Sequence, residues 1–227
     1  MRRFNLLLVA VAVIAAGALF YNATRTPAAG PRAGGEAPVA MSAADSAFKG
    51  YALGSDSAPV KIVEYVDFEC PICAEFGALQ FPYIRDQLIK TGKVQWRMRD
   101  YPLPPTVHPY SRLAALATQC AGEQGKYFEM VDQLFNHHQW AQTGKDPTAL
   151  FHDLAVAAGV NGASYDACVS TNRYAGRVEA GRIEGEARGV NGTPTIFING
   201  KEYTGRDRSS DAFQAIVDSL TRSPKRK

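Results

Sequence analysis

Cys70-Pro71-Ile72-Cys73 is the most informative stretch of the sequence, because it contains two cysteines separated by two residues. The stretch before the pair, Val60-Lys61-Ile62-Val63-Glu64-Tyr65-Val66, is apolar and β-branched, which predicts a buried strand. The stretch after it, residues 74–90, predicts a helix that Pro82 should kink. Cys70 would then lie at a helix N-terminus, where unpaired N–H groups and the helix dipole favour a thiolate. Because the thiolate attacks disulfides, the spacing indicates a redox-active pair.

The rest of the body predicts an α/β protein with a helical block inside it. The expected elements are a strand at 94–101, several helices within 108–188, a strand at 195–198, an Asn199-Gly200 hairpin turn, a strand at 201–204, and a helix through 220 capped by Ser209 or Ser210. The order is βαβ followed by ββα, with helices between the halves. We therefore expect one domain built from residues 51–107 and 189–222, and an all-helical insertion over residues 108–188.

The N-terminal segment is expected to lie outside this fold. Arg2 and Arg3 precede an apolar run over residues 6–21, and residues 1–21 therefore predict either a signal peptide or a retained membrane anchor. In both cases the arginines favour a cytoplasmic N-terminus and an exported body. Residues 22–50 are rich in Ala, Gly, Pro and Ser and predict a flexible linker, and residues 223–227 predict a basic tail.

Composition excludes some classes of function and raises the question of a second cysteine pair. The net charge is only +3 and the basic residues are scattered, so nothing indicates nucleic-acid binding. The four histidines have no spacing that would complete a zinc site with the cysteine motif, so no metal is expected. Cys120 and Cys168 remain, and an exported chain favours a structural disulfide between them. The alternative is two buried free thiols.

The motifs together resemble the DsbA-like thiol–disulfide oxidoreductases of the bacterial cell envelope, which have a thioredoxin fold with a helical insertion. The resemblance covers nearly all of residues 58–220. The features that carry it are Phe68-Glu69-Cys70-Pro71-Ile72-Cys73 after a strand, Gly192-Thr193-Pro194-Thr195 before the hairpin, the helical block between them, and Glu64 six residues before Cys70.

The resemblance implies a role for each motif residue. Cys70 would be the nucleophile and Cys73 the resolving thiol. Pro194 would form a cis peptide bond, so that the backbone of Thr193 pairs with a substrate peptide. Glu64 would be a buried acid that relays a proton to Cys73. The alternatives are an inert disulfide or half a zinc site for the cysteines, an ordinary trans turn at Pro194, and a Glu64 that faces water.

The residues around the cysteines modify this picture. Pro71 suits the first helical turn, where its missing N–H is not needed. Ile72 stands where the best-known family members have a histidine that stabilises the thiolate, and Thr193 stands where they have a valine. Ile72 suggests a weaker oxidant, and both departures keep a reductase or isomerase role open. Asp67 and Glu69 are expected to be mostly solvated.

The implied activity is oxidation of cysteine pairs in newly exported proteins, without a metal or an organic cofactor. The expected partners are unfolded or partly folded exported proteins and a quinone-linked membrane protein that reoxidises the pair. Nothing in the sequence demands more than a monomer. Two alternatives stay open: a reductase or isomerase kept reduced by a membrane donor, and a non-catalytic thioredoxin-fold binding module or chaperone.

Overall fold

Strand β2 (Val60–Val66) lies inside a five-stranded sheet in the computed structural model, which describes residues 39–222. It pairs in parallel with β3 (Val94–Asp100) and antiparallel with β4 (Thr195–Ile198). The sheet is completed by β1 (Tyr51–Leu53) beside β3 and by β5 (Lys201–Glu202) beside β4, both antiparallel. The three predicted inner strands are confirmed, with β2 buried between neighbours on both sides.

The helix after the cysteine motif is broken into four segments. They are α3 (Pro71–Glu75), the π-helical η1 (Phe76–Gln80), α4 (Phe81–Ile84) and the π-helical η2 (Arg85–Ile89). In η1, the N–H of Phe81 bonds to the carbonyl of Phe76, five residues back. This wide turn comes directly before Pro82, which has no N–H to donate. The predicted helix and its irregularity at Pro82 are therefore both present.

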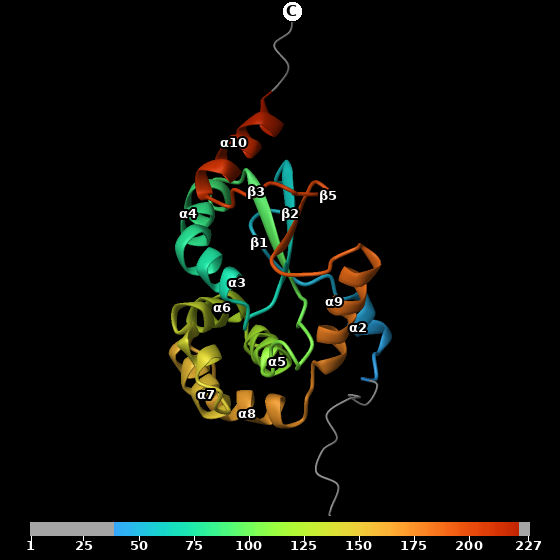
Figure 1. The fold of residues 1–227 in the computed structure, drawn as a ribbon, viewed down its shortest axis with the longest axis vertical. Coiled ribbons are helices and arrows are strands. Elements are labelled where there is room, and N and C mark those ends of the chain that lie inside the picture. Colours follow the sequence, from blue (N-terminus) through green and yellow to red (C-terminus); the bar gives the residue numbers. More distant parts are fainter. Residues whose placement is uncertain (1–38, 223–227) are drawn as a thin grey trace, which may run out of the picture. The chain divides into compact units, whose positions relative to one another are not determined.

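All the helices between β3 and β4 belong to one continuous stretch of sequence. They are α5 (Ser111–Gly122), α6 (Tyr127–Asn136), the 3-10 turn η3 (His138–Gln142), α7 (Thr148–Ala157), α8 (Gly162–Ser170) and α9 (Ala175–Ala187). Figure 1 shows α5–α8 gathered at one end of the sheet, while α9 runs back beside it. Gly181 and Gly185 lie against Asp100 and Tyr101, where a Cβ would collide with the neighbour, so α9 approaches β3 closely.

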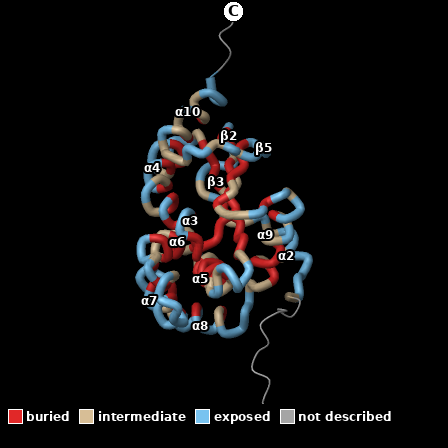
Figure 2. The backbone as a smooth tube through the Cα atoms, viewed as in Figure 1, coloured by how far each residue is buried: buried red, intermediate tan, exposed pale blue. Residues whose placement is uncertain are grey.

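The core is centred on the sheet and on the inner sides of the helices that pack against it, as the buried segments in Figure 2 show. Trp96 of β3 is fully buried and contacts the rings of Phe76, Phe81 and Phe213. Phe213 comes from α10 (Ser210–Thr221), which Ser209 caps by accepting a hydrogen bond from the N–H of Ala212. The predicted cap at Ser209 is confirmed, and the core joins the two halves of the fold.

The hairpin between β4 and β5 is short. Asn199 and Gly200 both have positive φ, as a type I′ turn requires. The predicted return strand over residues 201–204 is limited to Lys201–Glu202, because Tyr203 turns inward against Phe213. The chain then forms the loop 203–209, which leads into α10.

The predicted linker over residues 22–50 is wrong for its last part. Ala43–Ala47 form the helix α2, whose N-terminus has a capping box made by Ser42 and Asp45. This helix packs on α9, and the Arg177 guanidinium stacks on the ring of Phe48. These contacts with a distant helix order the segment despite its small, polar composition. The leader over residues 1–21, most of the linker and the tail over residues 223–227 lie outside the described residues.

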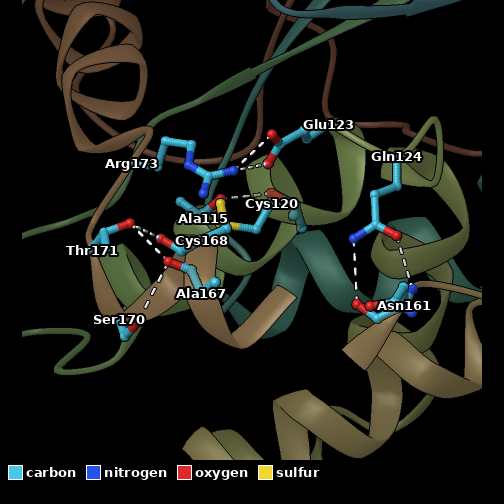
Figure 3. Close-up of a disulfide and its surroundings, with 11 residues drawn as sticks. Ala115, Cys120, Glu123, Gln124, Asn161, Ala167, Cys168, Ser170, Thr171 and Arg173 are labelled. Carbon is cyan, nitrogen blue, oxygen red and sulfur yellow. Dashed lines mark hydrogen bonds and ion pairs between the residues drawn. A yellow bond between two sulfur atoms is a disulfide. The ribbon is translucent and has the colours of Figure 1, made fainter. Parts of the chain in front are cut away.

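A disulfide joins two helices of the block. Cys120 near the end of α5 and Cys168 in α8 are bonded, with a Cα–Cα distance of 5.8 Å. Figure 3 shows two polar links that flank the bond. Arg173 donates to both carboxylate oxygens of Glu123 at 2.7 Å, and Gln124 exchanges hydrogen bonds with the backbone of Asn161. Within residues 39–222 no helix is long and apolar enough to cross a membrane.

Candidate active site

Cys70 lies at the N-cap of α3, directly after the loop that leaves β2. Its backbone is extended, and Pro71 occupies the first helical turn, where a missing N–H leaves no bond unmade. Only 5% of Cys70 is exposed, but Ile72 beside it is 53% exposed. The motif therefore meets solvent mainly through the isoleucine between the cysteines, with the first sulfur just beneath the surface.

The thiols of Cys70 and Cys73 are both free, and their pKa values are shifted in opposite directions. The hydrogen bond with Cys73, together with the backbone N–H groups of Cys73 and Ile72, lowers the pKa of Cys70 to about 6 against the effect of burial. Complete burial raises the pKa of Cys73 well above its ordinary value, and the bond with Cys70 adds to this. In the reduced state the motif thus holds a thiolate at Cys70 and a protonated thiol at Cys73 near neutral pH.

Thr193 and Pro194 lie next to the first cysteine, as expected. The Thr193–Pro194 peptide bond is cis, and the Sγ of Cys70 is 3.5 Å from the carbonyl oxygen of Thr193. Pro194 is buried, and Thr195 closes the turn by donating its hydroxyl to the carbonyl of Gly192. The segment runs directly into β4, so the sheet fixes the backbone that faces Cys70.

Glu64 is buried in the core below the motif, so it does not face water. Its Oε2 accepts a hydrogen bond from Nε1 of Trp96 at 2.9 Å, while Oε1 has no partner among the described residues. Burial raises the pKa of Glu64 to about 7, although Trp96 and the charge of Arg208 oppose this rise. Its charge also contributes to the raised pKa of Cys73, behind burial and the bond with Cys70. A carboxyl group that titrates near neutral pH thus lies close to the buried thiol.

Asp67 and Glu69 were expected to be solvated, and this prediction is wrong. Asp67 is 1% exposed and its carboxylate accepts three hydrogen bonds, from the N–H of Glu69 and Leu103 and from Nδ1 of His108. Glu69 accepts the N–H of Tyr110 at 2.7 Å. These bonds fasten the loop before Cys70 to residues 101–111. The signal in the sequence was the Pro-rich segment after β3. Prolines interrupt regular secondary structure there, so the N–H groups of the other residues in the segment need acceptors elsewhere.

Two hollows flank the cysteine motif. One of about 270 Å³ lies between Ile72 and Phe76 on one side and the loop with Arg206 and Arg208 on the other. A second, of about 260 Å³, is lined by Pro71, Glu69 and His138 among others. Within residues 39–222 no cluster of three or more histidines, cysteines or acids is arranged to hold a metal ion. The two neighbouring sulfurs of Cys70 and Cys73 offer the chemistry of thiol–disulfide exchange.

Comparisons with known proteins agree with this geometry. A family model described as thioredoxin matches residues 46–219. The chain is 35% identical over 152 residues to the Na(+)/H(+) antiporter NhaA 3 of Salinispora tropica, an alignment that covers 67% of this chain and 22% of that protein. Its fold is similar to the oxidised BdbD from Bacillus subtilis, with a TM-score of 0.67 and 25% identity over 74% of this chain and 91% of that one.

The oxidised Mtb DsbA is also similar, with a TM-score of 0.62 and 26% identity over 76% of this chain and 93% of that one. These matches confirm the predicted resemblance to DsbA-like proteins and the mixed α/β fold. The chain spans about a quarter of the length of the antiporters that it matches. Its activity must therefore be argued from its own residues.

Proposed function

The chain belongs to the thioredoxin family, and we propose that it catalyses thiol–disulfide exchange, with the Cys70–Cys73 disulfide as the oxidant of cysteine pairs in other proteins. One observation carries the proposal: two adjacent thiols at a helix N-terminus, the outer with a lowered pKa and the inner with a raised one. An inert structural disulfide would gain nothing from this difference, whereas an exchange reaction needs a good leaving group and a thiol that holds its proton.

The reaction balances as two successive displacements. A substrate thiolate attacks the Sγ of Cys70 in the disulfide form, a bond forms between these sulfurs, and Cys73 leaves with the electron pair. Cys73 takes up a proton, for which Glu64 is the proposed source. The second substrate thiolate then attacks the substrate sulfur of the mixed disulfide, and Cys70 leaves as a thiolate. The substrate loses two electrons and the cysteine pair gains them.

Thr193 and Pro194 are the proposed binding residues. The backbone of Thr193 lies beside Cys70 just before β4 begins, and an extended peptide could pair with it as an added strand. Such pairing would align the substrate sulfur with the sulfur of Cys70. Pro71 and Ile72 support the pair from within the motif, since one starts the helix and the other offers an apolar surface to the peptide.

The acidity of Cys70 favours oxidation over reduction. Whatever stabilises the thiolate stabilises the reduced state of the pair, and this makes the disulfide a stronger oxidant. Ile72 lacks the positive charge of a histidine, but backbone N–H groups and the Cys73 thiol act on Cys70 instead. The reduced pair must then be reoxidised, for which we propose a membrane redox partner.

We further propose that the reaction takes place outside the cytoplasm, in the cell envelope. The charged and apolar pattern of residues 1–21 supports this, and so does the Cys120–Cys168 disulfide, since such bonds persist in oxidising compartments. The substrates would be exported proteins that still contain free cysteine pairs.

The test is the equilibrium between the Cys70–Cys73 pair and a glutathione buffer. We expect a reduction potential well above the roughly −270 mV of thioredoxin. A value at or below that of thioredoxin would overturn the oxidant role and favour a reductase. The variant Cys73→Ser, with Cys70 first converted to a mixed disulfide with glutathione, should release glutathione and accumulate a mixed disulfide with a substrate protein that has one thiol, and Cys70→Ser should form none. If Cys70→Ser exchanges as well as the parent, the site itself is wrong.

A further inference from the structure

The hollow between Ile72 and the loop 203–209 has two arginines in its lining, although it lies next to the cysteine motif and the exposed Ile72. Ile72, Glu75 and Phe76 form one wall, and Arg206, Arg208 and Ser209 form the other. Arg206 is exposed and Arg208 is partly exposed. Neither guanidinium is within ion-pair distance of a carboxylate belonging to residues 39–222. Arg206 thus faces solvent beside the reactive cysteines, and Arg208, whose charge also acts on the buried Glu64, does so in part.

The loop that carries the two arginines is held in place on several sides. Tyr203 donates its hydroxyl to the carbonyl of Asp207 at 2.6 Å, and the carboxylate of Asp207 accepts the N–H of Ser209. The N–H of Ser210 bonds to Oε1 of Gln80 at 2.9 Å, which ties the loop to the helix on the opposite wall. The arginines are therefore presented from a rigid frame, and Asp207 is engaged within it.

We propose that this hollow is a subsite that selects an acidic side chain close to the reactive cysteine of a substrate polypeptide. The inference rests on the proposed exchange reaction, because a peptide bound through its sulfur at Cys70 has its neighbouring residues beside Ile72. There, Ile72 and Phe76 offer apolar contact, and among the residues that line the hollow two guanidinium groups face one carboxylate, Glu75. A glutamate or aspartate fits this combination, and a lysine does not.

The experiment measures how fast cysteine peptides reduce the Cys70–Cys73 disulfide of the purified protein. Two peptide series carry Glu or Gln at positions one to three residues on either side of the cysteine. Each rate constant is divided by that of the same peptide with a small neutral disulfide, which removes intrinsic differences in thiol reactivity. We expect the best Glu peptide to react about two- to fivefold faster than its Gln counterpart at low salt, and about equally at high salt.

Three variants localise the effect. In Arg206→Gln/Arg208→Gln the Glu-to-Gln ratio should fall to about one, and in Glu75→Gln it should rise above that of the parent. The control Arg222→Gln/Lys201→Gln also removes two positive charges, from exposed positions outside the hollow, and should keep the parent ratio. Because each result is a ratio between two peptides, a change in the basal reactivity of the cysteines cancels.

Two failures are distinguishable. If dithiothreitol reduces the disulfide readily but Glu and Gln peptides react equally, the subsite is absent and the exchange function stands. The same holds if the preference survives in the double arginine variant. If neither dithiothreitol nor any peptide reduces the disulfide, the proposed function itself has failed.

Discussion

Cys70 and Cys73 differ in pKa because they lie one helical turn apart, with Cys70 just beneath the surface and Cys73 in the core. Cys70 receives the N–H groups at the start of α3 and the hydrogen bond from its partner, so its negative charge is solvated by the protein. Cys73 is fully buried, so its negative charge would be poorly solvated. The difference depends on each thiol's neighbours rather than on the cysteine side chain itself.

The first prediction concerns the acidity of Cys70. In the reduced protein, the rate of alkylation at Cys70 should reach half its maximum near pH 6, since the pKa is lowered to about 6. Cys73→Ala should move this midpoint upward, because it removes the largest cause of the lowered pKa. Mass spectrometry of the alkylated cysteines over a pH series measures both. A midpoint near the ordinary thiol value of about 8.5 would contradict the account.

The second prediction concerns Glu64 and the stability of the disulfide form, in which neither Cys70 nor Cys73 titrates. Burial is the largest cause that raises the pKa of Glu64, from 4.5 to about 7 in the structure with free thiols, and burial also acts in the disulfide form. The folded protein therefore keeps a proton over this window that the unfolded chain releases. Stability should therefore fall as pH rises from about 4.5 to 7 and then level off.

Glu64→Gln cannot ionise and can still accept the bond from Trp96. Compared with the parent, it should gain on the order of 3 kcal/mol of unfolding free energy between pH 4 and pH 8. Denaturant unfolding at several pH values measures this difference. Other buried acids, such as Asp100, contribute equally to both proteins. Parallel curves for the two proteins would show that Glu64 ionises as freely when folded as when unfolded.

For single residues, the sequence predicted the reactive cysteines and the cis-proline motif better than it predicted the burial of the residues around them. The spacing of Cys70 and Cys73 and the Thr193–Pro194 motif are local, so they can be recognised without a structure. The burial of Asp67 and Glu69 depends on residues 101–111, more than thirty positions away. The residues next to Asp67 and Glu69 in the sequence do not reveal those donors, and the Pro-rich segment after β3 does not show which acceptors it meets.

Among the elements, the loop between β2 and α3 is held by carboxylates as well as by the apolar contact of Phe68 with Phe135. Asp67 links three donors that come from its own loop and from the segment after β3. A carboxylate enclosed in this way keeps the loop in one conformation, and with it the position of Cys70, whose N–H bonds to the carbonyl of Asp67.

The third prediction concerns this link. Asp67→Ala leaves the N–H groups of Glu69 and Leu103 without their acceptor, and it should lower the free energy of unfolding by about 3 kcal/mol. Asp166→Ala is a matched control, because Asp166 also lies 2.8 Å from a histidine, His152, but the side chain of Asp166 is 59% exposed and that of Asp67 is 0% exposed. The control should change stability by less than about 0.5 kcal/mol. Equal losses in both would mean that burial of the carboxylate does not matter.

The elements that the sequence missed are short and depend on distant partners. The helix α2 and the strand β1 have five and three residues, too few for a periodic pattern to be read. Each is fixed by tertiary contacts: α2 by α9, and Tyr51 of β1 by stacking on Tyr127. The long amphipathic helices and the inner strands carry their own patterns and were predicted.

In the described molecule as a whole, the helices α5–α9 form a long insertion between the strands of one sheet. Its helices connect β3 to β4, which lie on opposite sides of β2. The Cys120–Cys168 disulfide spans 48 positions within it, and the links of Glu123 and Gln124 reinforce the same contact between helices. Both cysteines of the bond are completely buried in the core.

The fourth prediction separates these two pairs of cysteines. Cys120→Ala/Cys168→Ala should lower the free energy of unfolding by about 4 kcal/mol, since the closed loop is long. Exchange between the Cys70–Cys73 pair and dithiothreitol should continue at a similar rate in the folded variant. Denaturant unfolding and stopped-flow reduction measure the two effects. A loss below about 1 kcal/mol, or a loss of exchange without unfolding, would contradict this division of roles.

The enclosure of Cys120 and Cys168 also constrains how each molecule is made. Both residues are completely covered in the finished fold, so an oxidant has no access to their sulfurs once α5 and α8 have closed over them. The bond has to be acquired during biogenesis, while the chain is still open. A protein proposed to introduce disulfides into newly made proteins therefore needs an oxidant for its own Cys120–Cys168 bond. That oxidant must be an older copy of the protein or another disulfide donor in the same compartment.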